Sequence, residues 1–365
     1  MAYPNAAGLQ AKSAKSNNDD DNALDVNDPN LSLNQKLRLH YKRGFAEGNK
    51  KYTSVIRATL VLISVINLYL TLHYFVPFTF EDFPPMAQYF IKVFFCFLHI
   101  NLWANWLCIV CYTNEYVPSK DRPDIDVQVF YDNPPDRFGA NVSLHQGNGH
   151  VAIDVTEKGG LPWRYCKHCD LNVPPRAHHC RICKTCVLRR DHHCFFVGTC
   201  IGHWNQRYFV MWVAYVMPIG YLGTYLTISY LRHSHAEDHS LWDYAVPVAV
   251  YKWIMGQLGG LQALLTFQAF FGCFIGPLAN FYFLSQFSVI AQGKTLYELA
   301  KKKNIRVTSS IEDNFRLVFG DYWMLNFFFP AQLLFKQLND GLHYDGIKVG
   351  PEPKTQGRES ASKNS

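Results

Sequence analysis

Four long apolar stretches stand out among the polar and charged positions of this chain of 365 residues. They occupy residues 58–76, 87–112, 208–231 and 260–290. A helix needs roughly 20 apolar residues to cross a hydrocarbon core of about 30 Å, and each stretch is close to that length or longer. Such runs are too long for the core helices of a soluble domain. The pattern therefore predicts an all-α polytopic membrane protein with four transmembrane helices, two within 55–112 and two within 208–290.

Polar residues inside these stretches are few. Lys92 lies near one end of the second stretch, where its long side chain can reach the membrane surface. His99, Asn101 and Asn105 lie further in, and we expect them to face other helices rather than lipid. The pair Gly276-Pro277 interrupts the fourth stretch, and because proline removes a helix hydrogen bond, we expect a kink there.

Basic residues next to the stretches predict the orientation of the helices. Those before the first stretch are Lys42, Arg43, Lys50, Lys51 and Arg57, and those after the fourth are Lys294, Lys301, Lys302, Lys303 and Arg306. Because Lys and Arg concentrate on the cytosolic side, both termini are expected in the cytosol. By alternation, the segment 113–207 returns to the cytosol as well. The connector 77–85 has acidic but no basic residues, which fits the opposite side.

The two ends of the chain are predicted to be cytosolic. Residues 1–50 form a polar tail with an acidic run at 17–21, and such a composition buries too little apolar surface to fold. This tail is expected to be disordered. Residues 291–365 form a cytosolic C-terminal region, and its polar end is expected to be disordered too.

The composition agrees with a lipid environment and points to a metal. Aromatic residues make up 15% of the chain, which is high for a soluble protein. The formal net charge of +6 is mild and gives no reason to expect a nucleic-acid partner. Seven of the eleven cysteines fall between Cys166 and Cys200. In a reducing cytosol this density is typical of metal binding rather than of disulfides.

These cysteines belong to a pattern that occurs twice, with an offset of fourteen residues. The pattern is C-x2-C-x9-H-x6-C; the first copy is Cys166, Cys169, His179 and Cys186, and the second is Cys180, Cys183, His193 and Cys200. Three thiolates and one imidazole are the ligands of a closed tetrahedral structural zinc site. The sequence therefore predicts two structural zinc ions, which would supply much of the folding free energy of this segment.

One cysteine of the segment is left over. Cys194 would begin a third copy, but Val197 stands in the place of the next thiol. His192 is not used by either zinc set, and Asp191 precedes it where the first copy has Ala177. A thiol, an imidazole and a carboxylate can serve as nucleophile, general base and the group that orients the base. The alternative is a purely structural pair of Asp191 and His192.

With these residues the segment resembles the DHHC cysteine-rich domain of the membrane-bound protein S-acyltransferases, the palmitoyltransferases. The residues that match are the eight zinc-ligand candidates together with Pro174, Arg176, the tetrapeptide 191–194 and Asn205. The domain would occupy residues 164–209 of the cytosolic loop 113–207, and the whole resemblance covers about residues 50 to 330. It implies a small zinc-bound domain of short β-hairpins and loops between the second and third helices.

The chain departs from this family's pattern in two places. Phe195-Phe196 follows the tetrapeptide where the family usually has Pro-Trp. In the Thr-Thr-x-Glu motif after the fourth helix, here 295–298, Leu296 stands in place of the second threonine. A leucine side chain forms no hydrogen bond, so the contact of that hydroxyl is absent or supplied by another group. The segment 314–320 resembles the family's C-terminal aromatic-and-asparagine element, with Asn314 as its anchor.

The resemblance implies an acyl transfer in two steps. Cys194 would take the acyl group of palmitoyl-CoA or another fatty acyl-CoA as a thioester, with His192 as base and Asp191 as its orienting group. It would then pass the chain to a cysteine of a cytosolic-face or membrane-associated protein. The acyl tail would lie between the helices. Arg176 and His178 are the expected contacts of the CoA phosphates, in competition with Lys184, Arg189 and Arg190. The expected location is the Golgi or ER membrane, with the plasma membrane as an alternative.

Two other classes of function also fit parts of the chain. A membrane-anchored zinc module that binds proteins or assists ubiquitin transfer accounts for the eight ligands, but not for Cys194 beside Asp191 and His192. A transporter with a metal-sensing cytosolic loop should carry paired charges near the middle of its helices, and these stretches carry none.

Overall fold

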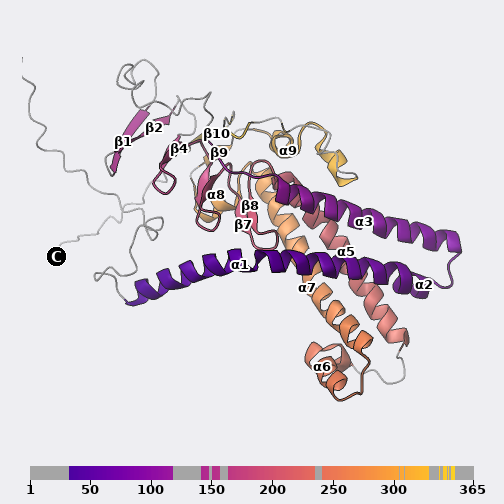
Figure 1. The fold of residues 1–365 in the computed structure, drawn as a ribbon. Helices are drawn as coiled ribbons and strands as arrows, with labels where there is room; N and C mark the ends of the chain where they lie inside the picture. The colour runs from indigo at the N-terminus through magenta and orange to yellow at the C-terminus, as the bar shows by residue number, and fades with distance from the viewer. Residues whose placement is uncertain are drawn as a thin grey trace, which may run out of the picture. The chain divides into compact units, whose positions relative to one another are not determined.

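The computed structural model describes residues 33–117, 141–147, 150–156, 163–234, 241–303, 305–307, 309–328, 337, 340–342, 344 and 347–349. The chain divides into two units, 1–52 and 53–365. In the first unit the described residues form the beginning of helix α1, Leu33–Leu70. The second unit contains the rest of α1 and all further elements (Figure 1).

Four helices of the described chain are long and apolar enough to cross a membrane, as predicted. They cover Tyr52–Thr79, Pro85–Cys111, Gln206–His233 and Gly260–Ala291. The first consists of the end of α1, a π-helical turn at Thr71–Phe75 and α2, Val76–Thr79. The others are α3, Pro85–Cys111, α5, Gln206–Ser234, and α7, Gly260–Ala291. Between α5 and α7 stand the short helices η4, Leu241–Tyr244, and α6, Val246–Ile254.

Helix α1 begins at Leu33 and so covers residues 33–50 of the tail that was predicted to be disordered. Residues 33–50 are rich in Leu, Lys, Arg and Gln, which have high helix propensity. Extending a helix that already exists costs far less than starting one. The helix therefore continues well before the apolar stretch. Residues 1–32 and 351–365 lie outside the described part of the chain.

Helix α5 packs against both α3 and α7, and small residues let α5 and α7 come close. A Cβ atom on Gly220 would lie 2.9 Å from the Cα atom of Gly276, which real side chains do not tolerate. Gly276 thus serves helix packing. Helix α7 also continues through Pro277 without a break, so the expected interruption at Gly276-Pro277 does not end the helix.

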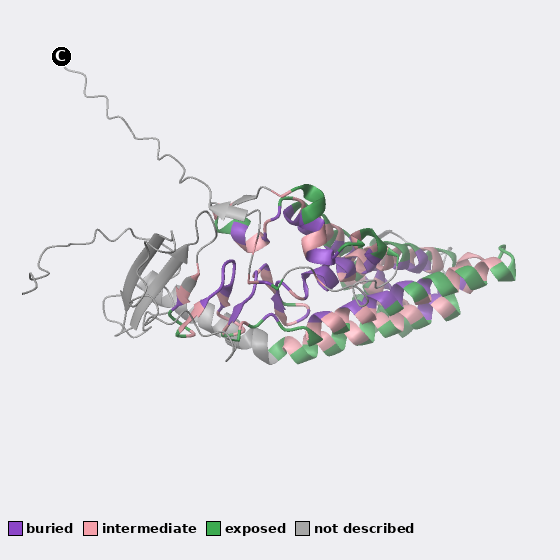
Figure 2. Ribbon diagram, turned by 90° about the horizontal axis from the view of Figure 1, so that it is seen from above, coloured by how far each residue is buried: buried purple, intermediate pink, exposed green. Residues whose placement is uncertain are grey.

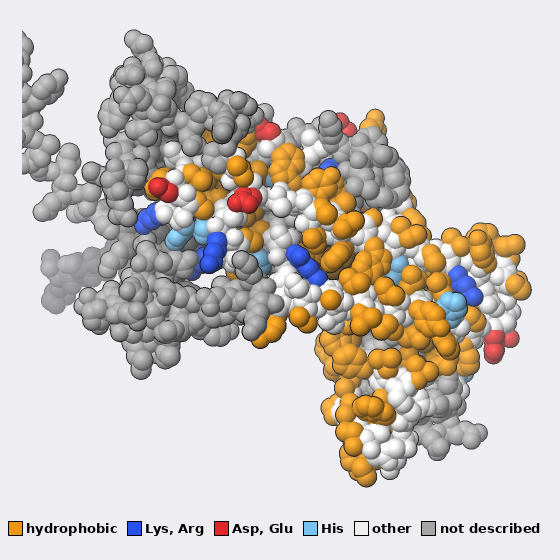
Figure 3. Space-filling model, in the orientation of Figure 1, with side chains coloured by type: hydrophobic (Ala, Val, Ile, Leu, Met, Phe, Trp, Pro, Cys, Tyr) orange, Lys and Arg blue, Asp and Glu red, His pale blue; other side chains and the backbone are white. Residues whose placement is uncertain are grey.

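The polar residues of α3 lie where we expected them. His99, Asn101 and Asn105 are buried. Each also bonds to its own helix: the Asn101 and Asn105 amides donate to backbone carbonyls, and His99 Nδ1 lies 2.9 Å from the Phe95 carbonyl oxygen. These bonds satisfy polar groups that lipid could not. By contrast, large apolar side chains are exposed along the four long helices, as the surface in Figure 3 shows on one face.

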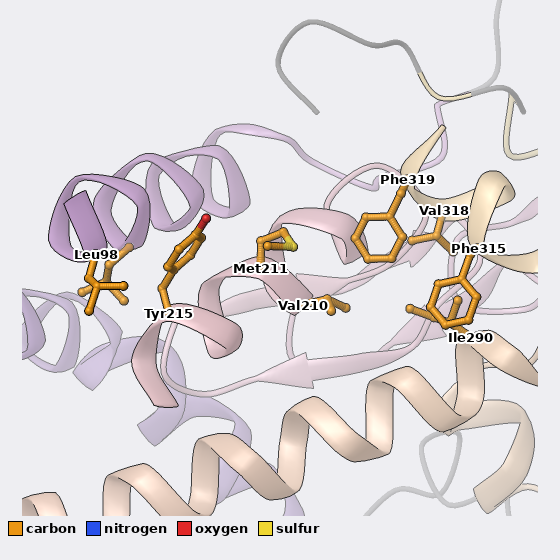
Figure 4. Close-up of a cluster of buried hydrophobic side chains, with 9 residues drawn as sticks. Leu98, Val210, Met211, Tyr215, Ile290, Phe315, Val318 and Phe319 are labelled. Carbon is orange, nitrogen blue, oxygen red and sulfur yellow. The ribbon is translucent and has the colours of Figure 1, made fainter. Parts of the chain in front are cut away.

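A buried apolar cluster connects α3, α5 and α7 with the short helix α9, Ile311–Phe319 (Figure 4). Its buried members are Leu98, Leu102, Val210, Met211, Tyr215, Ile290, Phe315, Val318 and Phe319. Asn314 of α9 is buried, and its amide donates to the Ala291 carbonyl at 3.0 Å. This bond joins α9 to the end of α7, the anchoring role expected for Asn314. The 3-10 helix η5, Trp323–Phe327, follows α9.

The cysteine-rich region consists of three antiparallel hairpins that repeat every fourteen residues. They are β3, Arg164–Cys166, with β4, Leu171–Val173; β5, His178–Cys180, with β6, Thr185–Val187; and β7, His192–Cys194, with β8, Thr199–Ile201. The pairing register repeats as well, as Arg164↔Val173, His178↔Val187 and His192↔Ile201. Figure 2 shows these strands largely buried or half-buried. The predicted short β-hairpins between the second and third membrane helices are therefore confirmed.

The turns of the three hairpins share one strained position. Asp170, Lys184 and Gly198 have φ values of 54°, 61° and 63°, in the left-handed region. The amide of each donates to the carbonyl of the cysteine four residues earlier, at 2.7–2.9 Å. Only the third turn has glycine, for which this conformation carries no penalty.

Two further two-stranded antiparallel sheets are described. They pair β1, Asn141–Gly147, with β2, His150–Thr156, and β9, Ile305–Val307, with β10, Ile347–Val349. A short helix, α8, Leu296–Ala300, lies between α7 and β9.

Candidate active site and metal sites

The two predicted ligand sets each converge in space. In both sets, one donor atom from each of the four residues lies within 4.8 Å of every other. The first set is Cys166, Cys169, His179 and Cys186, and the second is Cys180, Cys183, His193 and Cys200. Within a set the residues are buried or half-buried. The repeat therefore produces two separate clusters, as predicted.

The spacings between donor atoms fit a tetrahedral ion. The Sγ atoms of Cys169 and Cys186 are 3.6 Å apart, as are those of Cys183 and Cys200. The Cys169 Sγ atom lies 3.3 Å from Nδ1 of His179. A Zn–S bond of about 2.3 Å places two sulfur ligands about 3.8 Å apart in a tetrahedron. These short spacings are therefore the edges expected around a zinc ion, and thiolates with one imidazole are the donor set that zinc prefers.

Each cluster joins neighbouring hairpins. Cys166 and Cys169 come from the turn of β3–β4, whereas His179 and Cys186 face each other across β5–β6. The second cluster repeats this arrangement one hairpin later, and His193 pairs with Cys200 across β7–β8. Each hairpin has only three residues in each strand, which gives it little stability of its own. A metal at each of the two junctions would hold the three hairpins in a row.

Cys194 occupies the ligand position of the third hairpin. It stands at the end of β7 as Cys166 and Cys180 stand at the ends of β3 and β5. Val197 replaces the second turn cysteine, and the chain then enters α5. Cys194 lies outside both clusters. It is 5% exposed, within an apolar cluster that includes Ile109, Phe209 and Val213.

Asp191 and His192 are joined by a short hydrogen bond. His192 Nδ1 lies 2.7 Å from Asp191 Oδ2, and the Asp191 side chain is 0% exposed. Two groups from distant parts of the chain also donate to this carboxylate: the Gln286 amide to Oδ2 at 2.6 Å and the Leu296 backbone N–H to Oδ1 at 2.7 Å. The carboxylate is therefore held on both oxygens, and it orients the imidazole.

The electrostatics of the pair favour the ionised form of both groups. Burial would raise the pKa of Asp191, but the bond to His192 and the two other donors hold it below its ordinary value. Burial would lower the pKa of His192, but Asp191 and Cys194 raise it to about 9. His192 Nε2 forms no hydrogen bond to the described residues. Cys194 stands two residues further along the same strand, β7.

An apolar cavity of about 270 Å³ lies between α1, α3, α5 and α7. Trp106, Phe196 and Tyr282 line it, and the same three side chains pack against the cluster that contains Cys194. Its lining continues along the helices to Asn67, Thr224 and Gln268. The cavity therefore extends from the neighbourhood of the thiol into the membrane-spanning part of the protein.

The expected CoA contacts occupy different environments from those we predicted. The Arg176 side chain is 1% exposed and forms an ion pair with Glu298. His178 is buried, with its ring 4.1 Å from that of Tyr297. Because a buried guanidinium with a carboxylate partner offers a phosphate no open contact, the structure favours a structural role for Arg176. Of the competing residues, Arg189 is buried and Lys184 is exposed.

Several residues that position the site escaped the sequence interpretation. Gln286 and Arg57 lie in or next to membrane helices, where nothing in the local pattern distinguishes them. Arg57 donates from Nε to the Val197 carbonyl at 2.8 Å, in the turn after Cys194. The sequence showed Glu298 as the last residue of a motif, but it did not predict the ion pair of Glu298 with Arg176, 122 residues away.

Comparisons with known proteins agree with this geometry. The model of the DHHC palmitoyltransferase family matches residues 161–303, which include both clusters, the tetrapeptide 191–194 and Glu298. "Putative ZDHHC-type palmitoyltransferase 4" of Dictyostelium discoideum is 30% identical over 242 residues, 64% of this chain and 61% of that protein. "Palmitoyltransferase ZDHHC22" of Danio rerio is 31% identical over 240 residues, 65% of this chain and 74% of that protein. The chain thus spans less than two thirds of the first relative and about three quarters of the second.

Proposed function

The chain belongs to the DHHC palmitoyltransferase family, a family of acyltransferases, and on this premise we propose that it is a protein S-palmitoyltransferase with Cys194 as its nucleophile. The observation that carries the proposal is the placement of a thiol outside both metal clusters, beside the Asp191–His192 pair and next to an apolar cavity.

In the first step, His192 Nε2 takes the proton of the Cys194 thiol, and the sulfur attacks the carbonyl of a fatty acyl-CoA. A bond forms between Cys194 Sγ and the acyl carbon, the bond to the CoA sulfur breaks, and the CoA thiolate leaves with the proton from His192. In the second step, the thiol of a substrate protein attacks this new thioester and receives the acyl chain. Cys194 is then free again, and one thioester has replaced another.

Asp191 keeps the base in position during both steps. Its carboxylate holds His192 Nδ1, so that Nε2 remains available for the thiol proton. The group touching the reacting atoms is His192, and Asp191 acts through it.

The acyl chain would occupy the cavity between the four helices. An apolar cavity near the nucleophile would let the chain pass from the lipid to the thiol without contact with water. Trp106, Phe196 and Tyr282 would guide its first carbons away from Cys194. The CoA moiety would stay at the membrane surface, where the exposed Lys184 can approach its phosphates.

Two zinc ions would hold the cysteine-rich region, one in each cluster. Bound there, they would tie neighbouring hairpins together through the ligands of each cluster, outside the acyl transfer itself. The second cluster holds His193 and Cys200, on the two strands of the hairpin that ends in Cys194. Positioning the nucleophile is therefore the task of that hairpin's metal.

The distribution of the basic residues supports a site at the cytosolic face, with both termini in the cytosol. The acceptors would be cysteines of cytosolic-face or membrane-associated proteins. A Golgi or ER location is part of the same proposal.

The test is the transfer of a tagged palmitoyl group from palmitoyl-CoA to the purified protein. The wild type should carry a thioester that hydroxylamine removes, and Cys194→Ser should carry none while it retains two zinc ions per chain. Equal labelling of both proteins, or no labelling of a folded, zinc-loaded wild type, would reject Cys194 as the nucleophile. A membrane-anchored zinc module would then describe the protein better.

A further inference from the structure

A chain of buried polar side chains leads from Arg189 to the active-site carboxylate. Arg189 Nη1 donates to Gln206 Oε1, Gln206 Nε2 to Gln286 Oε1 at 2.9 Å, and Gln286 Nε2 to Asp191 Oδ2 at 2.6 Å. Arg189, Gln206 and Gln286 are all 0% exposed. The chain joins the loop before β7 with the first residue of α5 and the last turns of α7.

The two ends of this chain determine the orientation of both amides. A guanidinium only donates hydrogen bonds and an ionised carboxylate only accepts them. Gln206 must therefore turn its oxygen to Arg189, and its NH₂ group then meets the oxygen of Gln286. This leaves the NH₂ group of Gln286 directed at Asp191. Flipping either amide would leave two buried pairs unsatisfied, which costs more than either bond contributes.

Gln286 supplies a side-chain donor to Asp191, whereas the first residue of α8, Leu296, offers no polar side chain. Among the described residues, Asp191 accepts hydrogen bonds from His192, Gln286 and the backbone N–H of Leu296. The Leu296 side chain contributes nothing to this set, since it has no polar atom. The family motif has a threonine at that position. Gln286 of α7 is thus the side-chain donor to Asp191 Oδ2, whereas position 296 supplies only its backbone N–H, to Oδ1.

We propose that Gln286 is a positioning residue of the acyl transfer, which holds Asp191 Oδ2 against His192 Nδ1 with the support of Gln206 and Arg189. The proposal rests on the function proposed above, since it assigns Gln286 to the same reaction. A donor to an ionised carboxylate forms a charge-assisted bond, about twice as strong as a neutral one. Without it the carboxylate can rotate away from the imidazole, and His192 loses its orientation for the proton of Cys194.

The first variant is Gln286→Met, which keeps the length of the side chain and removes both polar atoms. We expect the rate of self-acylation at saturating palmitoyl-CoA to fall about ten- to a hundredfold, the effect of a lost hydrogen bond to a charged group. The KM for palmitoyl-CoA should stay unchanged, because Gln286 does not line the cavity. The matched control is Gln292→Met on the exposed end of the same helix, which should label at the wild-type rate.

A second substitution separates positioning from packing. Leu296→Thr places a hydroxyl three bonds from the backbone nitrogen that already lies 2.7 Å from Asp191 Oδ1. The double variant should self-acylate at least threefold faster than Gln286→Met. Leu296→Thr alone should change the self-acylation rate of the wild type little. A role of Gln286 in helix packing alone predicts no recovery. The non-additivity of the two substitutions is the measured quantity.

The outcomes distinguish this inference from the proposed function. If the wild type does not label, the proposed function fails first. If the wild type labels and zinc-loaded Gln286→Met labels equally fast, or if Leu296→Thr restores nothing, the role of Gln286 is wrong. Should Gln286→Met lose its zinc, Gln286→Glu replaces it in the test, since it keeps the shape and turns the donor into an acceptor. Wild-type labelling by that variant would equally overturn the proposal.

Discussion

Arg176 and Glu298 form a buried, two-pronged ion pair across 122 positions of the chain, with N–O distances of 2.7 Å on both prongs. Arg176 lies between the first and second hairpins, and Glu298 lies in α8, after the last membrane helix. Glu298 also accepts from the backbone N–H of Thr295, whose hydroxyl accepts from the N–H of Glu298 in return. The ion pair thus holds the start of α8, where the Leu296 N–H meets Asp191.

Removing the negative charge of this pair should destabilise the protein strongly. Glu298→Gln leaves the Arg176 guanidinium buried without its carboxylate, and breaking a buried pair from one side costs about 3–5 kcal/mol. We expect a markedly lower Tm in thermal unfolding of the detergent-solubilised protein, and slower self-acylation.

The control is Asp321→Asn, which breaks the ion pair Arg316–Asp321 on side chains that are 41% and 48% exposed. Exposed pairs contribute about 0–1 kcal/mol, so its Tm should stay close to that of the wild type. Similar Tm values for the two variants would show that the buried ion pair stabilises the protein no more than the exposed one.

The three turns allow a matched test of backbone strain. Gly198→Ala places a Cβ at φ 63°, where it would also meet the side chain of Thr53. The left-handed conformation alone costs a non-glycine residue about 1–2 kcal/mol. We expect a lower free energy of unfolding and slower self-acylation, since the Gly198 amide closes the turn on the Cys194 carbonyl.

Lys184→Gly makes the opposite change at the equivalent position of the second turn. Its relief of strain and its greater entropy in the unfolded chain oppose each other, so stability should change by less than about 1 kcal/mol. A loss in Lys184→Gly as large as that in Gly198→Ala would contradict the equivalence of the turns.

Loss of either metal should have unequal consequences for activity. Cys169→Ser and Cys183→Ser each remove one ligand, and each should lower the zinc content from two ions to one per chain. Cys183 belongs to the cluster that holds both strands of the Cys194 hairpin, so its variant should lose self-acylation. Cys169→Ser frees the first hairpin and should retain more activity. Elemental analysis gives the zinc content per chain, and labelling with tagged palmitoyl-CoA gives the self-acylation rate. Equal losses of activity in the two variants at equal zinc content would refute the unequal roles of the two clusters.

The cavity predicts a way to change the preferred acyl chain. Ile219 of α5 lines it, and Ile219→Trp would fill part of its length. Each methylene that no longer fits loses about 0.8 kcal/mol of burial, so self-acylation should shift toward shorter acyl-CoA chains. A series of saturated acyl-CoA substrates measures the shift. Tyr225→Trp, on the same helix but 60% exposed and outside the lining, should leave the preference unchanged.

Much of the fold and of the site could be predicted from local patterns. The four membrane helices depend on hydropathy over about twenty residues, and the metal clusters depend on a fourteen-residue repeat whose ligands lie close in sequence. The hairpins follow the same period, so pairing residues at fixed separations was enough to identify both ligand sets. Asp191, His192 and Cys194 are nearly consecutive, and their juxtaposition needed no knowledge of the tertiary structure.

The structure adds most to the sequence interpretation where local composition competes with longer-range effects. The polar segment 33–50 was expected to be disordered, but a helix already started by the apolar stretch extends through it. Arg176 was expected to contact CoA because it is basic and close to the active-site segment. Its ion pair with Glu298 depends on how the chain after α7 returns to the hairpins, which no local pattern encodes.

By itself, the sequence determined the membrane helices, the two clusters of metal-ligand candidates and the thiol that we propose as the nucleophile, because each depends on residues that are near neighbours in the chain. Only the tertiary structure decided which groups surround Asp191 and which helices enclose the cavity. Gln286 and Leu296 reach that carboxylate from 95 and 105 residues away. Such contacts arise when helices pack against one another, and packing selects partners by shape and burial rather than by distance along the chain.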